Sequence, residues 1–214
     1  MGIITHIIKT SNGEFHNVSY IIENEITHEG VLIDPAWESD KYETVAKRRK
    51  IKLTNILLTH SHIDHIDLVD YFIDAYNSNV FISQIEAKYY DFNCENLQLL
   101  HDGDVLNIAG VKIKCYLTPG HTLGSMCYEI NNNLFVGDTF FFEGCGNCNY
   151  SNDSIKKMYD SIQKIKKIFR DSTKVYSGHI FFKDVGHFLS EIKNNNISFL
   201  LDEEAFCEYQ KRRN

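Results

Sequence analysis

Short apolar runs separated by polar turns recur along the whole chain. Runs at residues 3–8, 18–23 and 31–34 predict the strands of an opening meander, with turns near residues 11–13 and 29–30. Further strands are expected at residues 55–58, 80–83, 105–108, 111–117, 125–130, 134–136 and 174–176, the last of these being the final strand. The pattern therefore predicts a protein rich in β-sheet.

Helical periodicity appears between these runs. The clearest case covers residues 153–169, where Ile155, Met158, Ile162, Ile165 and Phe169 form one apolar stripe opposite lysines. Other helices are expected at residues 39–50, 68–76, 83–90, 186–193 and 202–213. The basic run at residues 47–50 complements the negative end of its helix, although a patch for docking a partner is the alternative.

Length and charge narrow the class of protein. A chain of 214 residues with 43% apolar and 24% charged residues suits one globular domain, expected over residues 1–214 with a short helical extension at about 187–214. The net charge of −7 argues against general nucleic-acid binding. No apolar run approaches the roughly 18–20 residues that span a bilayer, and no signal peptide is visible, so a cytoplasmic location is expected.

Four potential metal ligands fall within six positions. His60, His62, Asp64 and His65 directly follow the apolar run at residues 55–58. Neither a strand nor one helix face can aim all four at one volume, but a loop leaving a strand can. Imidazole and carboxylate groups suit zinc and iron. A metal loop is therefore predicted, and a polar loop of solvated histidines is the alternative.

This His-x-His-x-Asp-His pattern resembles the metal loop of the metallo-β-lactamase superfamily. The remaining ligands of that superfamily have counterparts in order downstream, at His121, Asp138 and His179. The resemblance extends from about Ile3 to about His187. It implies an α/β fold of the αββα sandwich type, with the metal site at the edge between two mixed sheets.

The resemblance also implies roles for the ligands. His60, His62 and His121 would hold a first metal, Asp64, His65 and His179 a second, and Asp138 would bridge them. Two Zn²⁺ ions are expected, with iron or manganese as alternatives. A metal-bridging hydroxide would then be the nucleophile, with Asp64 and Asp138 as the catalytic carboxylates.

Single positions narrow the branch of the superfamily. The antibiotic-degrading branch has cysteine where this chain has Asp138, and flavodiiron proteins have glutamate in place of His62. The segment at residues 137–146 resembles the glyoxalase II-like thioester hydrolases. However, Asn147 replaces their basic residue, and only 35 residues follow His179, too few for their glutathione-binding domain.

The segments at residues 64–69, 100–104, 124–128 and 143–148 resemble the PksB/BaeB-type hydrolases of polyketide clusters. That resemblance implies hydrolysis of acyl thioesters on the phosphopantetheine arm of an acyl-carrier protein. Candidate substrate contacts are Phe141, Phe142, Asn147, Phe182 and Lys183. The alternative interpretations are that the aromatic residues belong to the core and that Lys183, a candidate for the phosphate of the arm, is a solvated lysine.

Several alternatives stay open at this point. The alternative activities are those of a hydrolase of glutathione or CoA thioesters, a lactonase and an iron persulfide dioxygenase, and a further alternative is a non-catalytic interaction protein that holds metal. Cys145-x-x-Cys148 is interpreted as loop packing, with redox or metal chemistry as the alternative. His187 lies either behind the site or at the surface, and the sequence does not specify an oligomeric state.

Overall fold

The computed structural model describes residues 2–148 and 153–213 and contains two six-stranded sheets. The first sheet has its strands in chain order: β1 (Ile3–Asn12), β2 (Phe15–Asn24), β3 (Glu29–Ile33), β4 (Lys52–Leu57), β5 (Asn79–Ser83) and β6 (Leu97–Leu100). Strands β1 to β3 are antiparallel, and β3 to β6 run parallel to one another. The sheet is therefore mixed.

The second sheet is also six-stranded and mixed, and the second half of the chain forms it. Its strands are β7 (Val105–Ile108), β8 (Val111–Leu117), β9 (Met126–Ile130), β10 (Asn133–Gly137), β11 (Lys174–Ser177) and β12 (His187–Phe188). Strands β7 to β10 are antiparallel, β10 and β11 are parallel, and β12 is antiparallel to β11.

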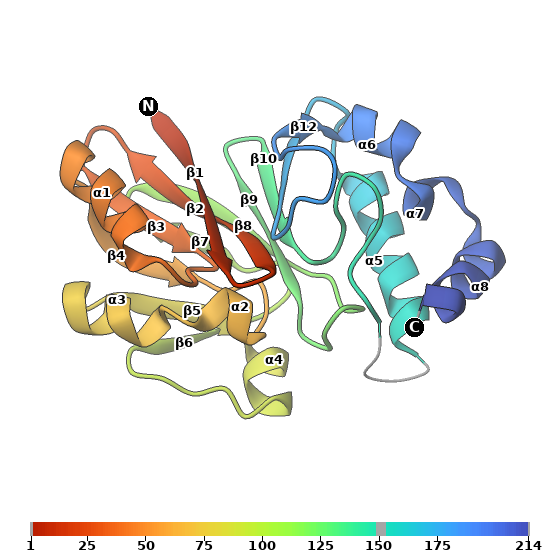
Figure 1. Cartoon of the computed structure of the whole chain (residues 1–214), viewed down its shortest axis with the longest axis horizontal. Helices are drawn as coiled ribbons and strands as arrows, with labels where there is room; N and C mark the ends of the chain where they lie inside the picture. The colour runs from red at the N-terminus through yellow and green to blue at the C-terminus, as the bar shows by residue number, and fades with distance from the viewer. Residues whose placement is uncertain (1, 149–152, 214) are drawn as a thin grey trace.

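Helices cover the outer faces of the two sheets (Figure 1). The first half supplies α1 (Ser39–Arg49), α2 (Ile63–Ile66), α3 (Val69–Tyr76) and α4 (Gln84–Tyr89). The second half supplies α5 (Ser154–Ile168), α6 (Leu189–Asn195), α7 (Ile197–Leu200) and α8 (Glu203–Arg213). Within the described residues, no helix is long and apolar enough to cross a membrane.

Three apolar clusters fill the layers. The central cluster joins the inner faces of both sheets, with Tyr20 and Leu57 from the first sheet and Ile113 and Phe135 from the second. One outer cluster packs the second sheet against α5 to α8, and the other packs the first sheet against α1, α3 and α4. The layers are thus helix, sheet, sheet and helix, which confirms the expected αββα sandwich.

Most predicted elements are present, with shifted ends and some omissions. The sequence pattern missed β6, α2, α7 and β12, so residues 174–176 are not the final strand. The helix expected at residues 186–193 begins only at Leu189, because residues 187 and 188 pair with β11. Short elements like these carry too few residues to show a period, and only their neighbours define them.

Candidate metal centre

The predicted ligands follow the ends of four strands that reach the same edge of the sandwich. His60 and His62 follow β4, His121 follows β8, Asp138 follows β10 and His179 follows β11. Strands β10 and β11 are parallel, and Gly178 N donates to Gly137 O at 2.9 Å, which sets Asp138 beside His179. Asp64 and His65 lie in α2 rather than in a loop, so the predicted loop is partly helical.

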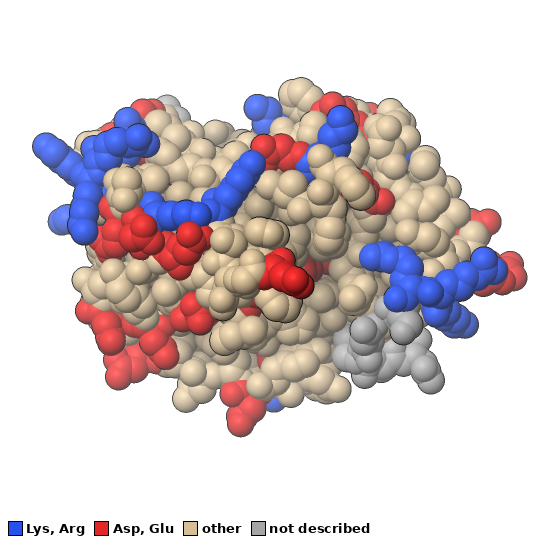
Figure 2. Space-filling model, viewed as in Figure 1, with Lys and Arg blue, Asp and Glu red and all other residues tan. Residues whose placement is uncertain are grey.

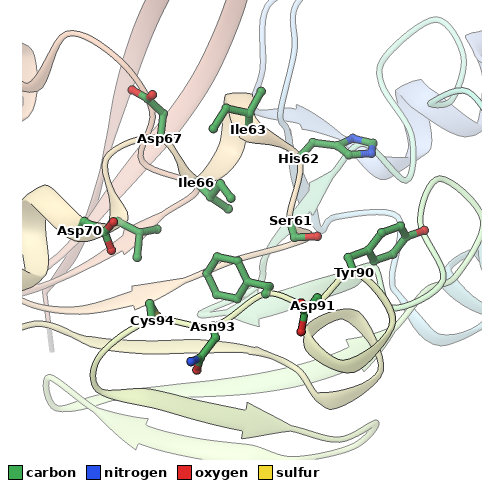
Figure 3. A pocket seen from close by; sticks show the side chains of 12 residues that line it. Ser61, His62, Ile63, Ile66, Asp67, Asp70, Tyr90, Asp91, Asn93 and Cys94 are labelled. Atoms are coloured by element: carbon green, nitrogen blue, oxygen red, sulfur yellow. The ribbon is translucent and has the colours of Figure 1, made fainter.

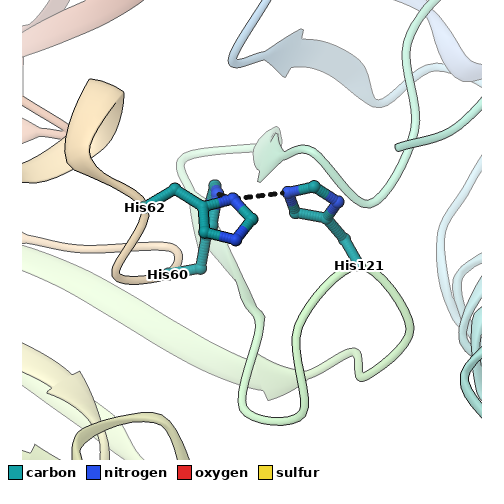
Figure 4. Close-up of side chains that lie close together, drawn as sticks. All are labelled: His60, His62 and His121. Atoms are coloured by element: carbon teal, nitrogen blue, oxygen red, sulfur yellow. Dashed lines mark hydrogen bonds between the residues drawn. The ribbon is translucent and has the colours of Figure 1, made fainter. Parts of the chain in front are cut away.

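Three histidines converge from the two sheets, as Figure 4 shows. The Nδ1 atom of His62 lies 3.1 Å from His60 Nε2 and 2.9 Å from His121 Nε2. One neutral ring nitrogen carries either a single proton or a lone pair, so it cannot satisfy two such neighbours equally well. A cation at the centre would accept all three lone pairs, which is the arrangement of a metal site with three nitrogen ligands.

A second group adjoins the first. The Nε2 atom of His179 lies 3.2 Å from Asp138 Oδ2 and 3.4 Å from Asp64 Oδ2. The Nε2 atom of His65 lies 3.5 Å from Asp138 Oδ1 and 3.8 Å from Asp64 Oδ2. The potential ligand atoms of Asp64, His65 and His179 lie within 4.8 Å of one another, and so do those of His60, His65 and Asp138. All seven predicted ligands are therefore brought together.

Two buried atoms at the centre of the cluster show that a cation fits there. Neither His65 Nε2 nor Asp138 Oδ1 has a hydrogen-bond partner within the described structure, and both side chains are buried. A buried polar atom left unpaired typically costs about 1–3 kcal/mol. A divalent cation between these groups would remove that cost, since a neutral imidazole nitrogen and a carboxylate oxygen are both good ligands.

Protonation differs between the two groups of ligands. Burial, followed by the nearby His65, holds the pKa of His60 well below its ordinary value. Burial and His121 lower the pKa of His62 to about 4, so both rings are neutral at pH 7. Burial opposes ionisation of Asp138, but His179 and His65 outweigh it and keep the pKa of Asp138 well below its usual value. Burial opposes protonation of His65 and His179, but Asp138 outweighs it and raises the pKa of both rings, to about 9 for His179, so these two rings release a proton when a metal binds.

Four of the ligand histidines have a described polar partner on the ring nitrogen that points away from the cluster. The Nδ1 atoms of His121 and His179 each lie 2.8 Å from a backbone carbonyl oxygen, of Asn147 and His16 respectively. His65 Nδ1 lies 3.0 Å from Asp34 Oδ2, and His60 Nδ1 lies 3.0 Å from Thr59 Oγ1. Such partners fix the ring orientation and direct the other nitrogen toward the metal.

Asp34 supports both His65 and Thr59, the residue that contacts His60. Its buried carboxylate accepts hydrogen bonds from Thr59 N and Thr59 Oγ1, both at 2.7 Å, in addition to its contact with His65. Asn17 plays a similar part for Asp64, donating from Nδ2 to the carbonyl oxygen of Asp64 and, at 3.2 Å, to its Oδ2. Neither residue was singled out from the sequence. Asp34 directly follows β3, which pairs in parallel with β4, and this position beside the start of the metal-binding loop could have identified it.

A cavity of about 420 Å³ opens onto the cluster, lined by Asp64, His121, Asp138 and His179. Its outer wall includes the aromatic side chains of Phe15, Phe141 and Phe181, together with Arg213 of α8. The sequence pointed to neither Phe15 nor Arg213 as a site residue, because both are far from the ligand motifs in the chain. Figure 2 shows basic side chains gathered near the end of α8, where Lys211, Arg212 and Arg213 occupy the last turn.

A larger cavity, of about 550 Å³, touches the cluster only through His62 (Figure 3). Its lining includes the carboxylates of Asp67, Asp70 and Asp91, and no lysine or arginine among the described lining residues. This cavity is unsuited to an anionic ligand, because its acidic groups would repel one. The 420 Å³ cavity is the better candidate for a substrate, because four of the seven predicted ligands line it and only His62 lines the larger cavity.

The predicted substrate contacts divide into two groups. Phe141 and Asn147 line the 420 Å³ cavity, whereas Phe142, Phe182 and Lys183 are not among its described lining residues. Phe142 packs against the ring of His187 at 4.6 Å, which places His187 away from the cluster. Lys183 N donates to Glu143 Oε1 at 2.8 Å, and Phe182 is 90% exposed.

Cys145 and Cys148 form no disulfide in the described structure, and both are buried in the apolar cluster around α5. Gln210 Nε2 of α8 donates to Cys145 Sγ at 3.0 Å. This placement agrees with loop packing, which the sequence favoured. The loop formed by these cysteines also carries the carbonyl of Asn147 that orients His121.

The fold is a sandwich of two mixed sheets, and the His/Asp cluster at its edge is suited to binding metal. The family model of the metallo-beta-lactamase superfamily matches residues 12–179, and the chain belongs to this superfamily.

The chain is 40% identical over 210 residues to the probable polyketide biosynthesis zinc-dependent hydrolase PksB of Bacillus subtilis, covering 98% of this chain and 93% of that protein. It is 39% identical, with the same coverage, to the probable polyketide biosynthesis zinc-dependent hydrolase BaeB of Bacillus velezensis. The crystal structure of ETHE1 from Myxococcus xanthus superposes with a TM-score of 0.86 at 26% identity, covering 98% of this chain and 91% of that one. Because the chain matches these zinc-dependent hydrolases over 98% of its length and belongs to their superfamily, it is a metal-dependent hydrolase.

Proposed function

We propose that this hydrolase is zinc-dependent and cleaves acyl thioesters carried on the phosphopantetheine arm of an acyl-carrier protein. The observation that supports it most is the 420 Å³ cavity, where the His/Asp cluster meets an aromatic wall and a single arginine. A pantetheine arm is a slender chain that ends in a phosphate, so its stem suits Phe141 and Phe181 and its phosphate suits Arg213. The similarity to PksB and BaeB, probable zinc-dependent hydrolases of polyketide biosynthesis, supports zinc dependence and a role in polyketide biosynthesis.

The predicted ligands would bind two metal ions in two groups. His60, His62 and His121 would hold one ion, and Asp64, His65 and His179 a second, with Asp138 between them. Bound zinc supplies a Lewis acid and lowers the pKa of water toward about 7. Hydrolysis then adds water to the thioester carbonyl, breaks the carbon–sulfur bond and releases a carboxylic acid and a thiol.

Residues of the chain position the attacking water and shield the reacting carbonyl from other water. Asn17 holds Asp64, whose carboxylate faces the cavity, so that it can orient the attacking water or take its proton. Phe141 packs edge-on against Phe181 at 4.9 Å, and its ring lies 6.0 Å from that of His179. This apolar wall limits the water around the reacting carbonyl, which strengthens electrostatic interactions in the site.

Intact-mass analysis of an acetylated acyl-carrier protein tests this proposal. We expect the acetyl mass to disappear with the enzyme, to persist with a chelator, and to be lost again when Zn²⁺ is restored. An unchanged carrier in the presence of fully metallated enzyme would overturn the carrier substrate. The same preparation is then assayed with glutathione and CoA thioesters, lactones and persulfides, the substrates of the alternative activities.

Arg213 allows a sharper version of the experiment. An Arg213→Ala variant should raise KM about tenfold for thioesters that carry the phosphate, which corresponds to about 1.4 kcal/mol. It should leave N-acetylcysteamine thioesters, which lack a phosphate, unchanged. Arg212→Ala is the matched control, because Arg212 has the same charge and the same helical turn but does not line the cavity. Equal effects of the two variants would exclude a phosphate contact at Arg213.

A further inference from the structure

We propose that Glu86 is a positioning residue for the three-histidine group, joining the two loops that carry His60, His62 and His121. Glu86 lies on α4, a helix with none of the predicted ligands, and its side chain is completely buried. Glu86 is not among the described lining residues of the 420 Å³ cavity. It therefore acts through other residues rather than on a substrate.

Each carboxylate oxygen of Glu86 holds one loop. Oε1 accepts hydrogen bonds from Ser61 N at 2.9 Å and from Ser61 Oγ at 2.8 Å. Oε2 accepts from Thr122 Oγ1 at 2.8 Å and from Gly124 N at 2.9 Å. Ser61 stands between His60 and His62, and Thr122 directly follows His121. The four bonds thus fix the immediate neighbours of all three histidines.

The two loops come from different sheets, which gives this link its importance. The loop of Ser61 leaves β4 of the first sheet, and the loop of Thr122 joins β8 and β9 of the second. The spacing between His62 and His121 therefore depends on contacts that cross the sandwich. Glycine at position 124 permits the close approach, because a Cβ there would lie 2.6 Å from Glu86 Cα.

The charge of Glu86 supports the same role. Among the residues that the structure describes, no lysine, arginine or histidine forms an ion pair with it. A buried carboxylate without a cationic partner costs several kcal/mol unless its hydrogen bonds and nearby positive charge offset that cost. Four donors and a divalent cation held by the adjacent histidines would provide both.

Zinc affinity measured by competition with a chromophoric chelator tests the proposal without any substrate. Glu86→Gln keeps the size of the side chain but sets an amide donor against groups that are already donors. We expect one equivalent of zinc to bind about 10–100-fold more weakly, the usual effect of losing a residue that orients ligands. The visible spectrum of the Co²⁺-substituted protein should change as well, because the ligand geometry relaxes.

Glu23→Gln is the matched control. Glu23 is also a fully buried carboxylate of the first sheet, but it bonds Arg49 and His6, which are not part of the cluster. Its substitution should lower stability and leave zinc affinity within twofold of the wild type. If Glu86→Gln is folded and also binds zinc within twofold of the wild type, Glu86 has only a structural role and the proposal is wrong.

Two further experiments test whether Glu86 affects zinc binding through the three-histidine group. In a His121→Ala background this group is already disabled, so adding Glu86→Gln should cost less than a further twofold in zinc affinity. An undiminished additional loss there would overturn the proposal. Should Glu86→Gln fail to fold, Ser61→Ala combined with Thr122→Val removes two donors and keeps the carboxylate. That pair should weaken zinc binding in the same direction, and unchanged binding would again overturn the role of Glu86.

Discussion

At the scale of single residues, the metal cluster depends on what lies directly behind it. His65 is completely enclosed, with Asp34 on one nitrogen and an unpartnered second nitrogen facing Asp138. The close packing leaves no room for an added atom on the inner side of the cluster. A Cβ at Gly178 would lie 2.5 Å from Asp138 Oδ1 and 2.6 Å from His65 Cε1.

Gly178→Ala should therefore weaken metal binding by tenfold or more, because the new methyl group would displace two ligands. The alanine itself fits the backbone, since Gly178 is not among the glycines with a left-handed conformation. Zinc titration against a chelator measures the effect. Gly144→Ala is the control, because the one described atom within 4 Å of its Cβ would be Arg213 Nη1, at 3.7 Å. Equal zinc affinity in the two variants would contradict the packing seen around Asp138.

A second residue-scale prediction concerns acid stability. Burial opposes ionisation of Glu23, but hydrogen bonds from Arg49 and His6 outweigh it and lower its pKa from the ordinary value of 4.5. A carboxyl group with a lowered pKa stabilises the fold above its unfolded pKa, and this contribution is lost as the pH falls through the folded value. Glu23→Gln should cost about 2 kcal/mol at pH 7.

The difference between wild type and Glu23→Gln should narrow as the pH falls below about 4.5, the ordinary value for glutamate. Urea unfolding of both proteins at pH 7 and at lower pH measures it, with chelator present so that metal release does not contribute. Parallel stability curves would show that Glu23 is not the group responsible.

At the scale of elements, the C-terminal helices pack on the loop that supports His121. Asn196 Nδ2 donates to the carbonyl oxygens of Phe141 and Gly144, both at 2.9 Å. Helix α8 reaches the same loop through Gln210 and through Arg213, whose Nη1 lies 3.3 Å from Cys145 O. The segment expected to be a short extension is thus packed against the loop beside the metal centre.

Phe206 anchors α8 in the apolar cluster around α5, where it is completely buried and contacts Tyr159 at 5.6 Å between ring centroids. Phe206→Ala should lower the free energy of unfolding by about 3 kcal/mol, because it leaves a cavity the size of a ring. Urea denaturation measures the loss. Phe182→Ala, at a 90% exposed position, should change stability by less than about 0.5 kcal/mol. A similar loss in both variants would argue against the docking of α8.

At the scale of the whole molecule, the cluster connects the two halves of the sandwich. His60, His62, Asp64 and His65 come from the first half, and His121, Asp138 and His179 from the second. A metal bound by both halves binds the folded state only, so its binding free energy adds to stability.

Removing the metal should consequently lower the unfolding free energy of the whole protein. A zinc concentration one hundred times the dissociation constant contributes about 2.7 kcal/mol. Thermal unfolding with chelator and with added Zn²⁺ measures the difference, and readdition of Zn²⁺ after dialysis checks that the loss is reversible. Coincident unfolding curves would show that the cluster does not hold zinc in the folded protein.

Much of the fold could be predicted because its longer elements bury one face with a regular period. The stripe from Ile155 to Ile165 lies on α5 and Phe169 directly follows that helix, and the runs before His60, His121 and Asp138 appear as strands. The αββα architecture came from the resemblance of the ligand motifs, and the two sheets confirm it. Strand β12 and helices α2 and α7 escaped prediction because their two to four residues cannot display a period.

What the sequence determined by itself is the chemistry: which histidines and aspartates are available, in what order, and after which strands. Only the tertiary structure determined which side chains support them. Asp34 contacts His65 from 31 positions away, Asn17 contacts Asp64 from 47 positions away and Glu86 bonds Ser61 from 25 positions away, and each has an ordinary local sequence. The physical reason is that a hydrogen bond depends on a separation of about 3 Å in space, and the pairing of strands across two sheets sets that separation.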